Sequence, residues 1–152
     1  ASIIFAKKNN DDVFEYLDVV ALVSPIGIFF GRIANFINSE LYGPVTNVPW
    51  SVTFINIDNL PRHPSQLYEA LLEGLVLFLI LIYFKNKFSN KPGLISALFL
   101  IFYSIFRFFV EFYRVPDEQL GFIFLNLSMG QVISLLFILS GVTLFYFKYE
   151  NR

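Results

Sequence analysis

The residues best suited to chemistry in this sequence are polar side chains that lie inside long apolar segments. Arg32 follows an apolar run that begins at Leu17, and Asn35 lies three residues later, which places both on one helical face. Arg107 and Glu111 are four residues apart in another apolar segment. Two interpretations fit such an arginine: it snorkels to the lipid headgroups at a helix end, or it faces a bundle interior or a watery cavity.

Arg32, Arg107 and Glu69 are expected at about the same depth in the membrane. At about 1.5 Å of rise per residue, Arg32 lies about 21 Å from a segment boundary near Asp18, and Arg107 lies about 21 Å from Gly93. Glu69 lies about 22 Å from the far end of a segment that runs in the opposite direction. Guanidinium binds phosphate in a bidentate fork and stays charged, and the abundant phosphate of a bilayer belongs to phospholipid. The spacing therefore predicts a site for lipid phosphate in the outer half of the membrane.

The glutamates in these segments also have a structural interpretation. Arg107 and Glu111 can form an ion pair that only holds the bundle together, although buried pairs are costly. Gln66, Glu69 and Glu73 share one helical face. For the two glutamates of that face, neutralisation of an arginine on another helix is the favoured interpretation.

The composition is typical of a membrane protein. Hydrophobic residues make up 56% of the chain and charged residues 15%, and the mean hydropathy is +0.62. The sequence has no cysteine and one histidine, His63, so it predicts no disulfide, no thiol nucleophile and no metal site. The net charge is −1 and no basic run is present, which argues against nucleic acid as a partner.

These patterns predict an all-α polytopic membrane bundle of about four transmembrane helices, preceded by a truncated one. The expected helices cover 13–37, 64–84, 92–113 and 128–147, each long enough to cross an apolar core of about 30 Å. Asp11 or Asp12 is expected to cap the first of them, and Ser128 the last. The chain is expected to be a single membrane domain over 1–152. A small extramembrane cap at 38–64 is inserted in it and contains a short strand near 51–55.

Lysine and arginine placement predicts the orientation. The segments expected on the cytoplasmic side share a concentration of basic residues. These are Lys7, Lys8, Lys85, Lys87, Lys91, Lys148 and Arg152. The cap, His63 and the loop at 116–127 are then external. The apolar stretch 1–6 is too short for a secretory signal and suggests the last turns of a membrane helix, so we expect a C-terminal fragment of a longer protein.

Four stretches resemble the signature segments of the prolipoprotein diacylglyceryl transferase family, and they occur in the family's order. They are GRIANFINSELYG at 31–43, RHPSQLYE at 62–69, the stretch 107–117, and SMGQ at 128–131. The resemblance implies a bacterial inner-membrane enzyme that needs no cofactor. It would move the diacylglyceryl group of phosphatidylglycerol onto the lipobox cysteine of a prolipoprotein signal peptide and release glycerol 1-phosphate.

The resemblance also implies roles for individual residues. Arg32 corresponds to a phosphatidylglycerol-binding arginine, and Gly43 and Arg114 are assigned to substrate binding with it. The residues implied in catalysis are Asn35, Glu40, Tyr103, Arg107 and Glu111. His63 and Glu69 are further candidates, although His63, next to Pro64, also fits a helix-entry residue.

The base that removes the thiol proton stays open at this level. Members of the family carry further N-terminal helices and a His-Gly-Gly segment whose histidine is another candidate base, and these 152 residues lack that segment. We therefore expect the chain alone to be inactive. The alternative function is a non-enzymatic lipid- or ion-binding membrane subunit or a transporter fragment. Inverted repeats would support a transporter, and the sequence contains no internal repeat.

Overall fold

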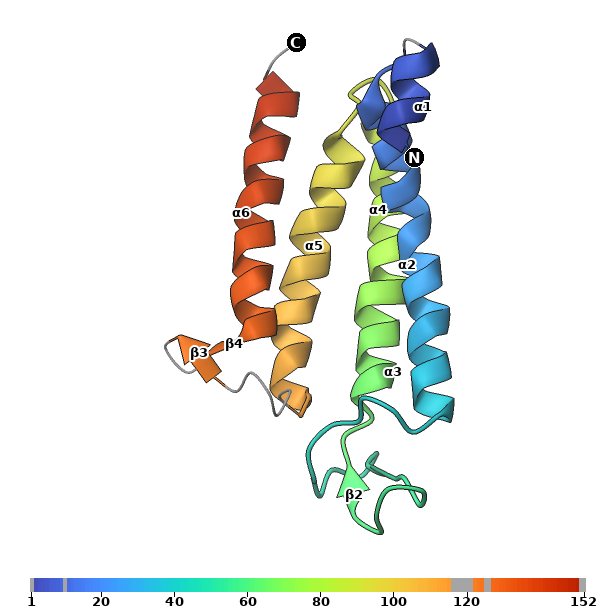
Figure 1. Ribbon diagram of the computed structural model, residues 1–152, viewed down its shortest axis with the longest axis vertical. Coiled ribbons are helices and arrows are strands. Elements are labelled where there is room, and N and C mark those ends of the chain that lie inside the picture. Colours follow the sequence, from blue (N-terminus) through green and yellow to red (C-terminus); the bar gives the residue numbers. More distant parts are fainter. Residues whose placement is uncertain (1, 10, 116–121, 125–126, 151–152) are drawn as a thin grey trace.

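The computed structural model describes residues 2–9, 11–115, 122–124 and 127–150, and it is a bundle of long helices (Figure 1). Among these residues, four helical segments are long and apolar enough to cross a membrane. They are α2 (Val13–Ile37), the continuous run α3–η1–α4 (Ser65–Lys87), α5 with η2 (Leu94–Tyr113), and α6 (Met129–Glu150). A short helix, α1 (Ser2–Asn9), precedes them. The predicted all-α membrane bundle is confirmed.

Local capping explains where two of the helices begin. The Asp12 carboxylate accepts a hydrogen bond of 2.9 Å from the Phe14 amide, so Asp12 caps α2. At the start of α6, the Ser128 amide donates to the Gln131 side chain at 3.0 Å, and the Gln131 amide donates to the Ser128 hydroxyl at 3.3 Å. This reciprocal pair is a capping box. Both predicted caps are therefore confirmed.

The second spanning segment is not a uniform α-helix, which the sequence did not predict. It starts as α3 (Ser65–Glu69), widens into the π-helix η1 (Ala70–Val76) and continues as α4 (Leu77–Lys87). Its buried side chains recur about every four residues. They are Ser65, Gln66, Glu69, Ala70, Glu73, Gly74, Leu77 and Leu81. The wider π-helical turn offsets the drift that this spacing would have in a regular α-helix, so one buried face is maintained.

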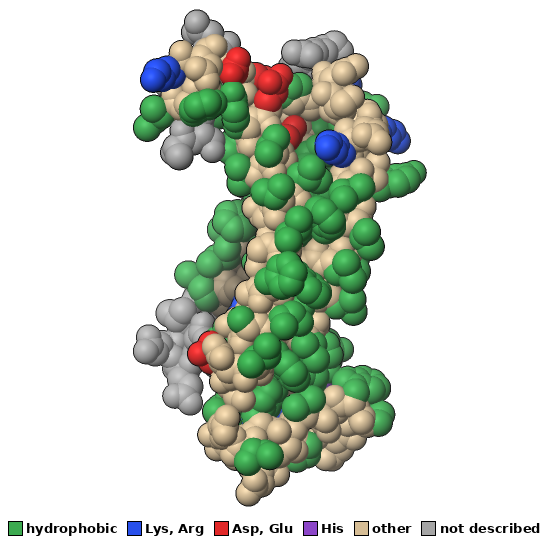
Figure 2. Space-filling model, turned by 90° about the vertical axis from the view of Figure 1, so that its right-hand side faces the viewer, with side chains coloured by type: hydrophobic (Ala, Val, Ile, Leu, Met, Phe, Trp, Pro, Cys, Tyr) green, Lys and Arg blue, Asp and Glu red, His purple; other side chains and the backbone are tan. Residues whose placement is uncertain are grey.

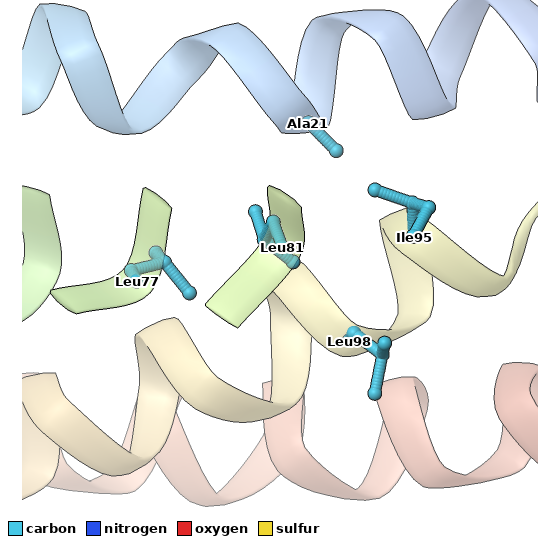
Figure 3. Packing of buried hydrophobic residues seen from close by; sticks show 5 residues of the cluster. All are labelled: Ala21, Leu77, Leu81, Ile95 and Leu98. Carbon is cyan, nitrogen blue, oxygen red and sulfur yellow. The ribbon is translucent and has the colours of Figure 1, made fainter. Parts of the chain in front are cut away.

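The apolar core lies where α2, α4 and α5 meet, between the lysine-rich end of the bundle and the charged residues. Figure 3 shows its members, which are Ala21, Leu77, Leu81, Ile95 and Leu98. Gly74 lets α2 approach η1 closely, because a Cβ there would lie 2.7 Å from the Phe29 Cβ. Hydrophobic side chains also cover much of the outer surface along the helices (Figure 2), as expected for helices that face lipid.

Different segments of the chain lie at the two ends of the bundle. α1, the connection between α4 and α5, and the C-terminal end of α6 lie at one end, and the segment 38–64 lies at the other (Figure 1). The lysine-rich segments predicted to share a side therefore do so for the described residues. Arg152, Pro116 and Asp117 lie outside the described residues, as does most of the predicted external loop at 116–127.

A small antiparallel ribbon organises the cap. Strand β1 (Val52–Thr53) pairs with β2 (Pro61–Arg62), so the predicted strand near 51–55 is present in shorter form. The Arg62 guanidinium lies 2.6 Å from the Asp58 carboxylate and 4.9 Å from the centre of the Tyr42 ring. Hydrogen bonds from Arg62 hold the pKa of the Asp58 carboxyl below its usual value. The contribution of this pair to stability is therefore present near neutral pH and is lost as the pH falls.

A second ribbon precedes α6. Strand β3 (Phe122–Phe124) pairs with β4 (Leu127–Ser128), and the register shifts between Phe122 and Phe124. The ribbon ends at Ser128, the residue that caps α6. It therefore fixes the position at which the last spanning helix begins.

At the opposite end, Asp18 of α2 caps α5 across the helix interface. Its carboxylate accepts hydrogen bonds from the Gly93 amide at 2.7 Å, the Ser96 amide at 2.8 Å and the Ser96 hydroxyl at 2.6 Å. Gly93 has φ of +99°, a conformation that favours glycine. The carboxylate thus satisfies backbone donors at the start of α5 that have no partner within the helix.

We expect Asp18→Ala to lower the free energy of unfolding by about 1.5–3 kcal/mol, since hydrogen bonds to a charged acceptor are lost together. Denaturant titration in mixed micelles measures this change. The matched control is Glu15→Ala, because Glu15 is an exposed acidic residue on the same helix and forms no ion pair among the described residues. Equal stability of the two variants would contradict the capping role.

Candidate functional site

Six charged residues form ion pairs inside the bundle, and together they are called the layer: Arg32, Glu69, Glu73, Arg107, Glu111 and Arg114. Its centre is the carboxylate of Glu69, which is fully buried. The Arg32 Nε of α2 lies 2.9 Å from Glu69 Oε2, and the Arg107 Nη1 of α5 donates to Glu69 Oε1 at 2.6 Å. Three spanning segments thus bring opposite charges together at one depth. The coincidence that the helix rise predicted for these residues is confirmed.

The layer extends towards α6 through Glu111. The Arg107 Nη2 lies 3.0 Å from Glu111 Oε2, and the Ser128 hydroxyl donates to Glu111 Oε1 at 2.9 Å. A Cβ on Gly130 would lie 2.9 Å from the Glu111 carboxylate, so a larger residue there would displace that carboxylate. Arg114, just after η2 (Glu111–Tyr113), reaches Glu69 Oε1 at 3.8 Å. Glu111 therefore connects the arginines of the layer to the start of the last helix.

Glu73 is a second fully buried carboxyl, one turn along η1 from Glu69. Its oxygens lie 3.9 Å from the Arg32 Nη2 and 3.7 Å from the Arg107 Nη1. Glu69 and Glu73 were both predicted to neutralise arginines on other helices, but of these two glutamates Glu69 forms the short ion pairs, at 2.9 and 2.6 Å. The face shared by Glu69 and Glu73 was the signal that both would point into the layer.

The acidic and the basic side chains of the layer differ in how much of their surface is exposed. The carboxylates of Glu69 and Glu73 are 0% exposed, whereas the side chains of Arg32, Arg107 and Arg114 are 19%, 14% and 13% exposed. The glutamates are enclosed, whereas part of each arginine side chain stays accessible. An incoming group thus meets positive charge first. This arrangement suits an oxyanion such as phosphate, because a planar guanidinium can donate to two of its oxygens.

Three residues that were predicted to be catalytic lie beside this layer and not in its ion pairs. Tyr103 is one turn before Arg107 on α5 (Leu94–Val110), and its ring stacks on Phe99 with centroids 5.5 Å apart. The Glu40 amide donates to the Asn35 carbonyl at 2.9 Å, where the chain leaves α2. Among the described residues, neither the Asn35 nor the Glu40 side chain forms an ion pair or hydrogen bond with the arginines.

Gly43 has a packing role in this structure. Its amide donates to the His63 carbonyl at 2.9 Å, and a Cβ there would lie only 2.5 Å from the Tyr113 carbonyl oxygen. Any larger residue would push the cap away from the end of η2. Gly43 therefore supports the site through the position of the cap, and its predicted contact with substrate stays a prediction.

His63 lies in an aromatic cluster where the chain enters α3. The Trp50 indole donates to the Tyr68 hydroxyl at 2.7 Å, and the same hydroxyl is hydrogen-bonded to His63 Nδ1 at 3.1 Å. The His63 ring also packs against Tyr113 with centroids 5.3 Å apart. These contacts match the helix-entry interpretation of His63. The ring edges a cavity of about 380 Å³ whose lining also includes Leu72.

Fold and site together define a polytopic membrane protein with a guanidinium–carboxylate layer shared by three of its spanning segments. The model of the family described as prolipoprotein diacylglyceryl transferase matches residues 1–147. The chain belongs to this family.

Curated relatives are similar over almost the whole chain. The phosphatidylglycerol–prolipoprotein diacylglyceryl transferase of Rickettsia bellii (strain OSU 85-389) is 54% identical over 146 residues, which cover 95% of this chain and 56% of the relative. That of Rickettsia akari (strain Hartford) is 52% identical over 143 residues, which cover 93% and 55%. That of Rhodospirillum rubrum is 51% identical over 148 residues, which cover 95% and 54%. The chain thus spans just over half the length of these relatives.

Proposed function

We propose that this chain is part of an enzyme that transfers the diacylglyceryl group of phosphatidylglycerol to a cysteine thiol. The acceptor is the lipobox cysteine of a prolipoprotein signal peptide, and the released product is glycerol 1-phosphate. The observation that carries this proposal is the partial exposure of Arg32, Arg107 and Arg114 above carboxylates that are fully buried. Family membership favours this activity over a lipid-binding or transporting subunit.

The accessible guanidinium groups suit the charge changes of this reaction. The sulfur of the cysteine forms a bond to the carbon of the diacylglyceryl group that carries the phosphate. The bond from that carbon to the phosphate oxygen breaks. Negative charge gathers on the departing phosphate, where Arg32 and Arg107 stabilise it from two helices. Glu69 holds both arginines in place and Glu111 holds Arg107, and their ion pairs of 2.6–3.0 Å support this positioning role.

Other residues take roles around this centre. Arg114 adds positive charge beside Glu69, and Tyr103 lies on the same helix one turn from Arg107. We assign Asn35 and Glu40 to the entrance of the site, since they lie where α2 ends and the cap begins. A base must accept the thiol proton. His63 Nδ1 is hydrogen-bonded to the Tyr68 hydroxyl at 3.1 Å, a contact that suits the helix-entry role.

A turnover assay tests this function. The complete natural protein that contains this chain is purified in a neutral detergent and mixed with phosphatidylglycerol and a lipobox peptide. The expected products are the diacylglyceryl peptide and glycerol phosphate in equal amounts, detected by mass spectrometry. A peptide with serine in place of the cysteine is the control and should stay unmodified. Folded protein that makes neither product would contradict the proposed function.

We also propose that the cap at 38–64 is external and that the lysine-rich end is cytoplasmic. The grouping of basic residues at one end supports this orientation. Because the chain has no cysteine, Asn47→Cys and Asn90→Cys each introduce a single thiol. An impermeant thiol reagent applied to intact cells should label position 47 and leave position 90 unlabelled until the membrane is opened. The reverse labelling pattern would overturn the orientation.

A further inference from the structure

Within the described part of the chain, the Glu73 carboxyl has no hydrogen-bond partner, although it is fully buried. Both of its oxygens lack a donor among the described residues, and its nearest cations are 3.7 and 3.9 Å away. Glu69 and Glu111, by contrast, have arginine nitrogens at 2.6–3.0 Å. An ionised carboxylate that is buried without hydrogen bonds is costly. Of the three carboxyl groups in the layer, Glu73 therefore loses the least favourable interaction when it is protonated.

The charged and titratable groups around Glu73 come from each helix packed against it. α2 contributes Arg32, and α5 contributes Tyr103 and Arg107. Its own spanning segment contributes the carboxylate of Glu69, and Arg114 also acts on it electrostatically. A second carboxylate so close to Glu69 is unfavourable unless the arginines compensate both charges.

The charge balance of the layer changes when an anion enters. Arg32, Arg107 and Arg114 supply three positive charges, and ionised Glu69, Glu73 and Glu111 supply three negative charges, so the empty layer is neutral. A phosphodiester adds one negative charge in a low-dielectric region, where an uncompensated charge is costly. The arginines that turn towards the phosphate also withdraw from Glu73. A proton on Glu73 restores neutrality.

We propose that Glu73 takes up a proton when the anionic phosphodiester of the lipid binds between Arg32 and Arg107. Lipid binding in this layer is then coupled to one proton, and Glu73 acts as a positioning and charge-balancing residue that does not touch the reacting atoms. This proposal rests on the proposed function, since phosphatidylglycerol is taken as the ligand.

Calorimetry on the complete natural protein in neutral detergent tests the coupling. Phosphatidylglycerol is titrated in two buffers with different ionisation enthalpies, from about pH 6 to pH 9. We expect one proton taken up per lipid wherever Glu73 is ionised in the empty site, and a dissociation constant that rises about tenfold per pH unit there. Glu73→Gln keeps the shape and stays neutral, so it should bind without proton uptake and with little pH dependence.

Glu15→Gln is the matched control, because Glu15 is an exposed glutamate at the far end of α2, and it should bind as the natural protein does. Binding without proton uptake, or uptake that persists in folded Glu73→Gln, would overturn the coupling and leave the proposed function intact. If Glu73→Gln fails to fold, the natural protein still tests the coupling, because binding without proton uptake would overturn it. Absence of phosphatidylglycerol binding at every pH would overturn both proposals.

Discussion

Arg107→Ala is expected to lower turnover per folded molecule by about 10²–10³, the cost of losing a group that stabilises charge developing in the transition state. The Arg107 side chain touches both Glu69 and Glu111 and keeps 14% of its surface accessible, so it is held in place and still available to substrate. Arg32→Ala should have a similar effect, because Arg32 approaches the same layer from α2. The assay is the rate of peptide lipidation by the complete natural protein in detergent.

Lysine variants separate a role in phosphate binding from a role in folding. Arg32→Lys and Arg107→Lys keep the charge but lose the planar fork, so they should recover only part of the lost rate. Arg62→Ala is the control, because Arg62 forms its ion pair in the cap and not in the layer. Melting temperatures are measured beside the rates. Near-normal turnover of well-folded Arg32→Ala and Arg107→Ala proteins would contradict the phosphate site.

Glu69→Ala is expected to lower the free energy of unfolding by about 3–5 kcal/mol, since it removes a fully buried carboxylate that is the shared partner of Arg32 and Arg107. This should be the largest loss of stability among substitutions in the layer. Glu69→Gln should lose less, because the amide oxygen still accepts one hydrogen bond. Denaturant titration in mixed micelles gives both values, with Glu15→Ala as the exposed control. A Glu69→Ala protein as stable as that control would show that Glu69 does not hold the layer together.

The helix boundaries were largely predictable because apolar length and capping act locally. The segment 13–37 was predicted with the bounds that α2 has, since Asp12 precedes it and Asn38 follows it. The later helices run further than expected, to Lys87 and Glu150. Lysines near a membrane surface can extend towards water while their backbone stays helical, so they do not end a helix as a polar run suggests.

The meeting of Arg32, Glu69 and Arg107 was also predictable, because helix rise and bilayer thickness fix depth along each segment. The rotation of each helix about its axis is not fixed in this way. The π-helix η1, which sets the direction of Glu73, therefore could not be predicted from spacing alone. The hydrogen bond from Ser128 to Glu111 could not be predicted either, because it depends on where α6 begins.

Contacts between distant segments were the least predictable features. Asp18 was expected only to mark the start of an apolar segment, yet it caps α5. Gly43 was assigned to substrate binding by resemblance, and its observed contacts with His63 and Tyr113 explain why glycine is required there. Neither contact leaves a periodic signal in the sequence, because each depends on two segments that meet only in the folded chain.

The central claim is that Arg32 and Arg107 together contact the phosphate of the bound lipid. Magnetic-resonance dipolar coupling between lipid phosphorus-31 and nitrogen-15 in the arginine side chains of the complete natural protein tests it directly. Arg32→Lys and Arg107→Lys identify which signals belong to these residues. We expect coupling from bound phosphatidylglycerol to both guanidinium groups and none to Arg62 of the cap. Tightly bound lipid whose phosphorus couples to neither Arg32 nor Arg107 would contradict the claim.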